Sequence, residues 1–318
     1  MSRARCPEGP LRSGRACVAT WNQARLFGVL GDPVDHSLSP AMHNAAFAAA
    51  GLPHVYLRYR VPATRLPAAV REAKALRMGG LNLTVPLKEA VLPLLDAVTR
   101  EAERIGAVNT VLFAPGGRTV GDNTDGRGFL AALRGRVRLR GARALVIGAG
   151  GSARAVGTAL CRAGAARVTI ANRTPARGER LAERLGRLGA GVAAAVPLAA
   201  LERGQALEDA TLVVNATPLG LAGGAPRVRY AATRPGCLFV DLVYAPRPTA
   251  FLAGAARAGR RTLGGAHVLL HQGALAFEAW TGYRAPRTVM ARALRAAGLT
   301  LTLRARTARV AARRPPMR

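Results

Sequence analysis

Lysine, acidic residues and aromatic residues are all scarce in this sequence. Only two of its 47 basic residues are lysines, Lys74 and Lys88, so arginine carries nearly all of the formal net charge of +30. Aromatic residues make up 4% of the chain, too few to supply stacking platforms between the basic residues. Because the arginines are spread along the chain, we attribute them to compositional bias and expect no specific nucleic-acid binding.

Long apolar runs and closely spaced cysteines are also missing. No uncharged apolar run reaches the roughly 18 residues that a membrane span needs, and the first 25 residues lack the apolar centre of a secretion signal. The four cysteines are too scattered for a zinc cluster or a disulfide framework. His267 and His271 lie one helical turn apart, but no further ligands complete a metal site. We expect a cytoplasmic protein with free thiols, no membrane contact and no metal.

Arginine is concentrated at the two ends. Residues 1–25 contain five arginines, and residues 304–318 contain six. We predict disordered extensions over residues 1–25 and 301–318. The chain between them is long enough for two ordinary domains, and half of all the residues are apolar.

Apolar segments alternate with helical patterns between residues 26 and 299, which predicts an α/β protein with parallel sheets. In the first half we expect strands at 26–30, 55–61 and 79–84, and helices at 40–50, 65–77 and 88–95. Pro86 would end the third strand, so Lys88 would lie at a strand-to-helix turn, where ligands collect in open sheets. A lysine can lose its proton when desolvated, whereas arginine keeps it, so Lys88 is a candidate acid and base.

A glycine-rich turn marks the second half. A predicted strand at 143–147 runs into Gly148-Ala149-Gly150-Gly151-Ser152-Ala153 and a helix. Gly148 would permit a tight turn, Gly150 would let the backbone approach a pyrophosphate, and Ala153 would allow close packing of helix on strand. This context predicts a Rossmann-type dinucleotide-binding domain.

The end of the next strand, at 167–171, indicates which dinucleotide is bound. It is followed by Asn172-Arg173-Thr174-Pro175-Ala176-Arg177. An NAD site usually places an acidic residue here, and none is present, while two arginines would attract a 2′-phosphate. The pattern favours NADP, although proline after threonine is also an ordinary helix start.

Two later strands, at 211–215 and 237–241, end in Asn215-Ala216-Thr217 and in the segment 241–244, which we expect near the nicotinamide. Helical patterns at 265–280 and 286–297 are expected to return to the first domain. We therefore predict an N-terminal α/β domain over 26–124 plus 266–300, and a nucleotide-binding domain over 125–265.

A hydroxyl-rich loop, His36-Ser37-Leu38-Ser39-Pro40, could hold an anion or merely begin a helix. Together with this loop, the chain resembles the shikimate dehydrogenase family at many separated motifs between residues 26 and 297. These are Asn82-Leu-Thr84-Val-Pro-Leu-Lys88, Gly106-Ala-Val-Asn109-Thr110, Asp122-Asn-Thr-Asp125-Gly126, Gly148-Ala-Gly-Gly151, Asn172-Arg-Thr174, Asn215-Ala-Thr217, Asp241-Leu-Val-Tyr244 and Gln272-Gly-Ala-Leu-Ala-Phe277.

The resemblance implies NADP-dependent, reversible reduction of 3-dehydroshikimate to shikimate, in the pathway to chorismate and aromatic amino acids. It implies that Lys88 exchanges a proton with the reacting oxygen during hydride transfer, and that Asp125 orients the amine. Read from the residues alone, Asp125 could simply cap a helix. The implied substrate-binding residues are Ser37, Ser39, Asn82, Thr84, Asn109, Asp125, Tyr244 and Gln272, with the two serines on the carboxylate.

The resemblance also implies which residues bind the cofactor. They come from the glycine-rich turn, from the end of the following strand and from the segments expected near the nicotinamide. Leu242, His267 and Val268 depart from the commonest family pattern, which puts the details of nicotinamide packing in question. The set comprises Gly148, Ala149, Gly150, Gly151, Ser152, Ala153, Asn172, Arg173, Thr174, Arg177, Thr217, Leu242 and Gly265.

Three alternatives remain open. A related dehydrogenase could accept quinate and prefer NAD, but Ser37 with Ser39, and the missing acid near Asn172, favour shikimate and NADP. A methylenetetrahydrofolate dehydrogenase would share the two-domain plan but not these motifs. A basic regulatory protein on a retired enzyme scaffold would lack dehydrogenase activity. We expect a small-molecule substrate and a monomer or homodimer.

Overall fold

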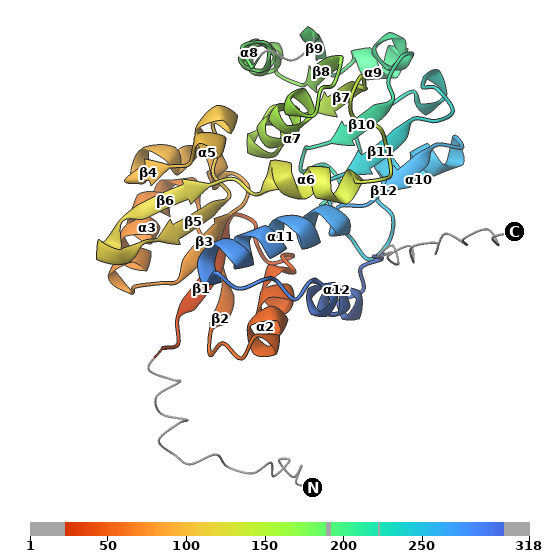
Figure 1. Cartoon of the computed structure of the whole chain (residues 1–318). Coiled ribbons are helices and arrows are strands. Elements are labelled where there is room, and N and C mark those ends of the chain that lie inside the picture. Colours follow the sequence, from red (N-terminus) through yellow and green to blue (C-terminus); the bar gives the residue numbers. More distant parts are fainter. Residues whose placement is uncertain (1–22, 189–191, 222, 302–318) are drawn as a thin grey trace, which may run out of the picture.

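The computed structural model describes residues 23–188, 192–221 and 223–301, which form two α/β domains, each built on a six-stranded sheet (Figure 1). The extensions predicted over 1–25 and 301–318 lie almost wholly outside the described residues. No helix among the described residues is both long and apolar enough to cross a bilayer. Within the same residues, no group of three or more His, Cys, Asp or Glu side chains could hold a metal ion.

The first sheet has the strand order β2-β1-β3-β5-β6-β4. Strand β1, second from one edge, pairs in parallel with β2 and β3, but β5 is antiparallel to both β3 and β6. The expectation of wholly parallel sheets is therefore wrong for this domain. The bounds are β1 Leu26–Gly31, β2 Val55–Arg60, β3 Gly80–Leu83, β4 Ala97–Val98, β5 Thr110–Phe113 and β6 Thr119–Asp122.

A short connection explains the antiparallel pair. Only five residues join β5 to β6, and a parallel crossover needs a dozen or more. Gly116 and Gly117 both adopt positive φ in this connection, and the amide of Ala114 donates to the carbonyl of Arg118. The chain therefore reverses as a hairpin.

Four helices belong to the first half of this domain: α2 Ser39–Ala49, α3 Leu66–Ala75, α4 Leu87–Ala90 and α5 Arg100–Ile105. The helix predicted over 88–95 is shorter than expected. It ends at Ala90, and Pro93 lies in a following 3-10 turn over Leu92–Leu94, because proline has no amide to continue the helix. Lys88 lies in the first turn of α4, directly after β3, as predicted.

The second sheet is parallel throughout, in the order β12-β11-β10-β7-β8-β9. Renumbered from β7, this is the doubly wound order of dinucleotide-binding domains, with the switch point beside β7. The strands are β7 Arg143–Ile147, β8 Arg167–Asn172, β9 Val192–Pro197, β10 Leu212–Asn215, β11 Leu238–Asp241 and β12 Arg261–Leu263. The helices are α7 Gly151–Arg162, α8 Pro175–Gly186, α9 Ala200–Arg203 and α10 Ala250–Arg257.

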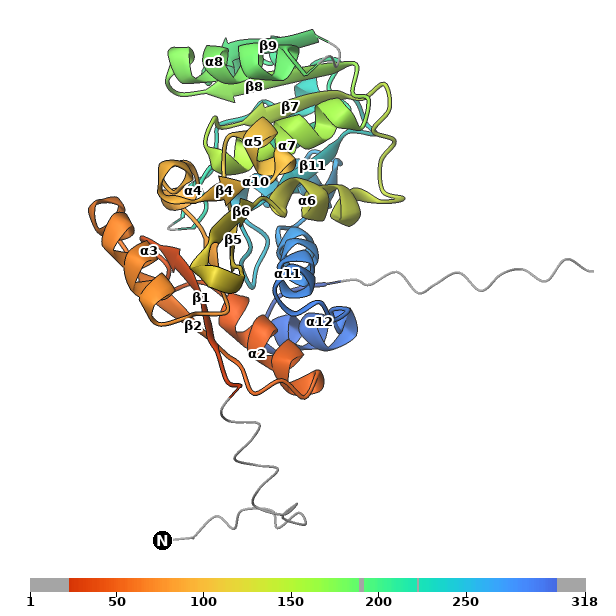
Figure 2. The same cartoon turned by 60° about the vertical axis from the view of Figure 1, so that its left-hand side comes forward.

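Helices α6 (Asp125–Leu133) and α11 (Ala266–Thr281) lie side by side between the two sheets (Figures 1 and 2). A Cβ atom on Gly128 would come within 2.6 Å of the backbone nitrogen of Gln272, so the helices pack almost backbone to backbone. Helix α12 (Arg287–Ala296) packs on α2, and α11 and α12 share a buried cluster with Phe27 and Phe47 of the first domain. The C-terminal helices thus return to the first domain, as predicted; the exact borders near residues 125 and 265 remain a prediction.

Candidate active site

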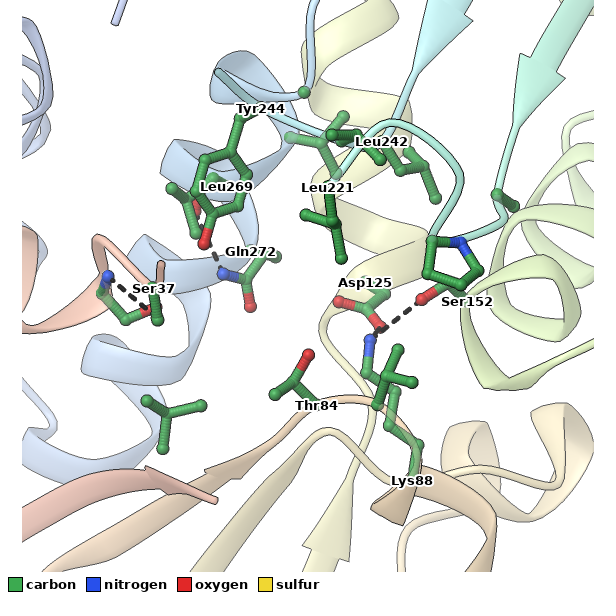
Figure 3. Close-up of a pocket in the computed structure, with 18 of the residues that line it drawn as sticks. Ser37, Thr84, Lys88, Asp125, Ser152, Leu221, Leu242, Tyr244, Leu269 and Gln272 are labelled. Carbon is green, nitrogen blue, oxygen red and sulfur yellow. Dashed lines mark hydrogen bonds and ion pairs between the residues drawn. The ribbon is translucent and has the colours of Figure 1, made fainter. Parts of the chain in front are cut away.

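A cavity between the domains brings together residues from both halves of the sequence (Figure 3). Many of the predicted site residues line it, although they come from loops after β1, β3, β10 and β11 and from helices α2, α4, α6, α7 and α11. The predicted residues in this lining are Ser37, Ser39, Thr84, Lys88, Asp125, Ser152, Thr217, Leu242, Tyr244, Gly265 and Gln272.

Lys88 and Asp125 form an ion pair in this cavity. The Nζ atom of Lys88 lies 2.6 Å from Oδ2 of Asp125 and 3.0 Å from Oγ of Ser152. The two charged side chains are only 13% and 14% exposed, and a charge-assisted bond in such surroundings is strong and directional. Asp125 begins α6, where its amide donates to Oδ1 of Asn123 at 3.0 Å. The structure therefore brings the two predicted catalytic residues into contact.

Asn109 lies behind Asp125 and holds its second oxygen. The Nδ2 atom of Asn109 donates to Oδ1 of Asp125 at 2.7 Å and contacts Oε1 of Gln272 at 3.3 Å. Its Oδ1 atom accepts from the Thr124 amide and from the Thr110 hydroxyl, both at 2.8 Å, which fixes the orientation of the amide group. Both oxygens of Asp125 are thus hydrogen bonded, one to Asn109 and one to Lys88.

Asn82 also lies behind the cavity wall. Its Nδ2 donates to the carbonyl of Asn109 at 3.0 Å and to the hydroxyl of Thr110 at 3.2 Å, and its Oδ1 accepts from the Tyr56 hydroxyl at 2.7 Å. Neither asparagine is among the residues lining the cavity. The sequence analysis missed Tyr56, whose position on β2 carries no motif; burial raises its pKa well above the usual value.

Ser37 and Ser39 are buried in the lining of the cavity, and Figure 3 shows Ser37 across the cavity from Lys88. The amide of Ser39 donates to Oγ of Ser37 at 3.3 Å. Tyr244 lies beside them, and burial raises the pKa of its hydroxyl, an effect that hydrogen bonding to Ser37 partly opposes. Among the described residues that line the cavity, Lys88 is the only lysine or arginine, so an anion near the two serines would be held by hydroxyl groups and backbone amides.

A second cavity follows the turn between β7 and α7. Gly148 has a φ of +108°, and a Cβ atom there would lie 3.0 Å from Cγ2 of Thr217, so glycine suits the turn on both counts. A Cβ on Gly150 would meet no atom within 4 Å, which leaves open space at the N-terminus of α7. That space fits a pyrophosphate, whose charge the helix terminus would stabilise.

The far end of the second cavity is basic. Arg173 and Arg177 line it, and the uncharged Asn172, whose Nδ2 donates to the carbonyl of Thr174 at 2.8 Å, ends β8. The acid in this lining is Glu89, which comes from α4 and lies 3.9 Å from Arg177 and 2.9 Å from Arg154. The sequence analysis missed Glu89, although its place directly after Lys88 could have suggested it.

Two predicted cofactor-binding residues line neither cavity. Ala153 is completely buried in the core of the second domain, consistent with its predicted packing role. Thr174 precedes α8, and its side chain makes no capping hydrogen bond there. The predicted residues that do line the second cavity are Gly148, Ala149, Gly150, Gly151, Ser152, Asn172, Arg173, Arg177 and Thr217.

The two cavities meet at Lys88 and Ser152, which line both of them. A ligand that extends along the glycine-rich turn would therefore reach the Lys88–Asp125 ion pair. Apolar side chains also line the first cavity, and apart from Leu242 and Val268 the sequence analysis missed them, because apolar residues carry no motif. They include Val156, Leu221, Val268 and Leu269.

Asp241 is buried beneath this junction and has a structural role. It accepts hydrogen bonds from Asn215 at 2.9 Å, from the amide of Val243 at 3.0 Å and from Thr249 at 2.6 Å. Burial raises the pKa of Asp241 to about 6, although these donors oppose the shift. The carboxyl group therefore ties the ends of β10 and β11 together and shapes the loop that carries Tyr244.

Comparison with known proteins agrees with this arrangement. Residues 29–111 match the model of the shikimate dehydrogenase substrate binding domain, residues 130–243 match shikimate / quinate 5-dehydrogenase, and residues 265–295 match the shikimate 5′-dehydrogenase C-terminal domain. Shikimate dehydrogenase (NADP(+)) of Methanopyrus kandleri is 47% identical over 277 residues, which cover 86% of this chain and 95% of that protein.

Solved structures show the same relationship. The shikimate 5-dehydrogenase of Thermus thermophilus in complex with NADP(H) and shikimate is 45% identical, with a TM-score of 0.75 over 86% of this chain and 99% of that one. The quinate dehydrogenase of Corynebacterium glutamicum in complex with NAD is 33% identical, with a TM-score of 0.77 over 86% and 99%. The present chain therefore belongs to the shikimate/quinate dehydrogenase family.

Proposed function

We propose that this protein catalyses the NADP-dependent, reversible reduction of 3-dehydroshikimate to shikimate, with Lys88 as acid and base and Asp125 as its partner. The observation that carries the proposal is the 2.6 Å contact between these two side chains at the junction of the two cavities. The product would serve the synthesis of chorismate and aromatic amino acids. The proposal includes action in the cytoplasm as a monomer or homodimer.

When bound, NADP(H) accepts or supplies a hydride at its nicotinamide ring. Lys88 gives a proton to the substrate oxygen during reduction and takes it back during oxidation, so charge does not build up on that oxygen. Asp125 accepts a hydrogen bond from the amine and holds it toward the cavity. Burial of both groups strengthens this interaction by excluding water.

The proposed substrate contacts follow the lining of the first cavity. Ser37 and Ser39 hold the carboxylate, and Thr84 and Gln272 contact the ring hydroxyls. Asn82 and Asn109 were predicted to touch the ring, but their positions favour a supporting role. Each of them uses its side-chain amide on neighbouring residues of the wall.

The choice of NADP rests on the end of β8. Arg173 and Arg177 would bind the 2′-phosphate, and Asn172 leaves the strand end without the carboxylate that would favour an unphosphorylated ribose. Ser37 and Ser39 support shikimate over quinate. A quinate dehydrogenase that uses NAD remains the second candidate, because a relative of that kind shares the fold.

Initial rates distinguish these candidates. Purified protein is assayed with shikimate and with quinate, each with NADP and with NAD, by following formation of the reduced cofactor. We expect the highest kcat/KM for shikimate with NADP. Lys88→Ala should lower kcat by about 100- to 10,000-fold and change KM less. A quinate preference, or a Lys88→Ala variant with normal kcat and raised KM, contradicts the proposal.

A further inference from the structure

Ser152 belongs to the glycine-rich turn of the second domain, but its hydroxyl contacts the amine of the first domain. Its Oγ lies 3.0 Å from Nζ of Lys88, and Figure 3 shows the hydroxyl and Asp125 converging on that amine. Ser152 lies in the first turn of α7, and Lys88 lies on α4, 64 positions earlier. The hydrogen bond therefore joins the two domains at the reacting group.

The backbone beside Ser152 is shaped for this approach. A Cβ atom on Gly151 would lie 2.9 Å from Cβ of Lys88 and 3.3 Å from Cβ of Ala107. Contacts as short as the first do not occur without movement, so a larger residue at 151 would push α7 away from the lysine. Glycine at this position thus permits the close approach of the two domains.

Two of the three N–H groups of the Lys88 ammonium have hydrogen-bond acceptors in the structure. Asp125 and Ser152 each accept one hydrogen bond, which leaves the third N–H for an acceptor in the first cavity. A hydroxyl can also donate, so Ser152 can hold the amine after it has released a proton. An amine fixed by two partners points its remaining hydrogen in one direction.

We infer that Ser152 is a positioning residue for Lys88 rather than chiefly a cofactor ligand, and that it aims the amine at the substrate oxygen only while the domains are together. The inference rests on the proposed function and adds a residue from the cofactor-binding domain to the acid–base site. It also explains how occupation of the glycine-rich turn, next to Ser152, can influence proton transfer.

Kinetic constants test this role. Ser152→Ala should lower kcat by about 3- to 10-fold at saturating NADP and shikimate, the usual effect of losing one hydrogen bond, and should leave the KM for NADP within about twofold. Ser152→Thr keeps the hydroxyl and should restore most of kcat. In a Lys88→Ala background the same Ser152→Ala change should have almost no further effect, because its partner is gone.

Thr158→Val is the matched control. Thr158 lies on the same helix, is 1% exposed, and its hydroxyl has no hydrogen-bond partner among the described residues. The replacement removes a hydroxyl of the same helix without changing side-chain shape. It should leave kcat and both KM values at wild-type levels.

A second measurement does not depend on catalysis. The chain has only two lysines, so limited acetylation followed by mass spectrometry compares Lys88 directly with the more exposed Lys74 as an internal reference. Acylation needs an amine that can reach the reagent, and the hydrogen bond to Oγ of Ser152 holds the Lys88 amine inside the cavity. Ser152→Ala should therefore raise the labelling of Lys88 relative to Lys74 by about 3-fold or more.

The outcomes separate the two proposals. Wild-type protein without shikimate activity overturns the proposed function, while the labelling ratio still reports whether Ser152 holds Lys88. An unchanged labelling ratio overturns the inference, and so does a Ser152→Ala variant that has normal kcat and a raised KM for NADP. Equal losses from Ser152→Ala in the presence and absence of Lys88 also overturn it.

Discussion

The side-chain amide of Asn109 donates to one oxygen of Asp125 at 2.7 Å, and this leaves the other oxygen for Lys88. The amide cannot turn round, because its own oxygen accepts from the backbone of Thr124. Asp125 therefore has a donor on each side and must present two acceptors. A carboxylate meets that requirement, whereas a carboxamide cannot.

Replacing Asp125 by asparagine should consequently reduce kcat by about 100-fold or more, because one NH2 group would face either Asn109 or the Lys88 ammonium. Steady-state kinetics with shikimate and NADP measure the loss, and circular dichroism checks folding. Asp35→Asn, an exposed change outside both cavity linings, serves as the control. A well-folded Asp125→Asn variant with a loss below threefold would show that the pair is not catalytic.

The two arginines after β8 predict cofactor selectivity. Arg177→Ala should raise the KM for NADP by about 10-fold or more and leave the KM for NAD nearly unchanged, because only NADP carries the 2′-phosphate. Arg173→Ala should act in the same direction. Arg187→Ala, at the other end of α8, where Arg187 pairs with Glu183, should change neither constant. Equal increases for both cofactors would place these arginines outside the phosphate site.

Replacing Glu89 should change the KM for NADP in the opposite direction. Its carboxylate lies 3.9 Å from Arg177, so it competes with a bound phosphate for that guanidinium. Glu89→Gln should lower the KM for NADP by about 2- to 3-fold in dilute buffer, and less at high salt, because partly exposed charges are screened.

Glu101→Gln is the control for Glu89. Glu101 also pairs across the domains, with Arg162, but it lies away from both active-site cavities. If both variants change the KM for NADP alike, the cause is a general loosening of the domains. If Glu89→Gln raises this KM, competition for Arg177 is excluded.

The burial of His43 should make the stability of the folded protein depend on pH. His43 is completely buried against Tyr56, with ring centroids 4.5 Å apart, and burial lowers its pKa to about 3. Below the ordinary histidine pKa of about 6.5 the unfolded chain binds a proton that the native state does not, so stability falls as the pH drops toward 3. From pH 7 to pH 5 the His43 contribution is about 2 kcal/mol.

Urea unfolding at the two pH values measures this contribution. His43→Leu should lose about 2 kcal/mol less than wild type between pH 7 and pH 5. Tyr56 stays neutral throughout this range, because burial raises its pKa. Phe47→Leu, in the same aromatic cluster, should keep the wild-type pH dependence. Identical pH dependence in wild type and His43→Leu would mean that His43 is protonated in the native state.

The sequence predicted the second domain more accurately than the first. The strand at 143–147 matches β7, and the glycines after it occupy the turn that the pattern required. The four inner strands of this sheet are buried apolar runs, and the strands predicted at 143–147, 167–171, 211–215 and 237–241 match them, whereas the more exposed edge strands β9 and β12 were not predicted. In the first domain, β5 and β6 are short strands joined by a hairpin, and the alternation of strands and helices gave no sign of them.

The sequence predicted which residues belong to the site, but not which of them line the cavity and which lie behind its wall. Lys88 and Asp125 could be paired because each stands in a family motif. That Asn82 and Asn109 lie behind the cavity wall depends on the packing of β3 against β5, which the sequence pattern does not determine. The contact between Ser152 and Lys88 likewise depends on how the two domains approach each other.

The glycine contact between α6 and α11 limits how this enzyme can move. Gly128 and Gln272 pack so closely that the helices cannot slide apart without losing backbone contact, and both helices begin near the predicted domain borders at residues 125 and 265. A rotation of one domain against the other would therefore bend the chain near the start of these two helices. Such a rotation would move Ser152 of α7 away from Lys88 of α4 and break the hydrogen bond that joins them.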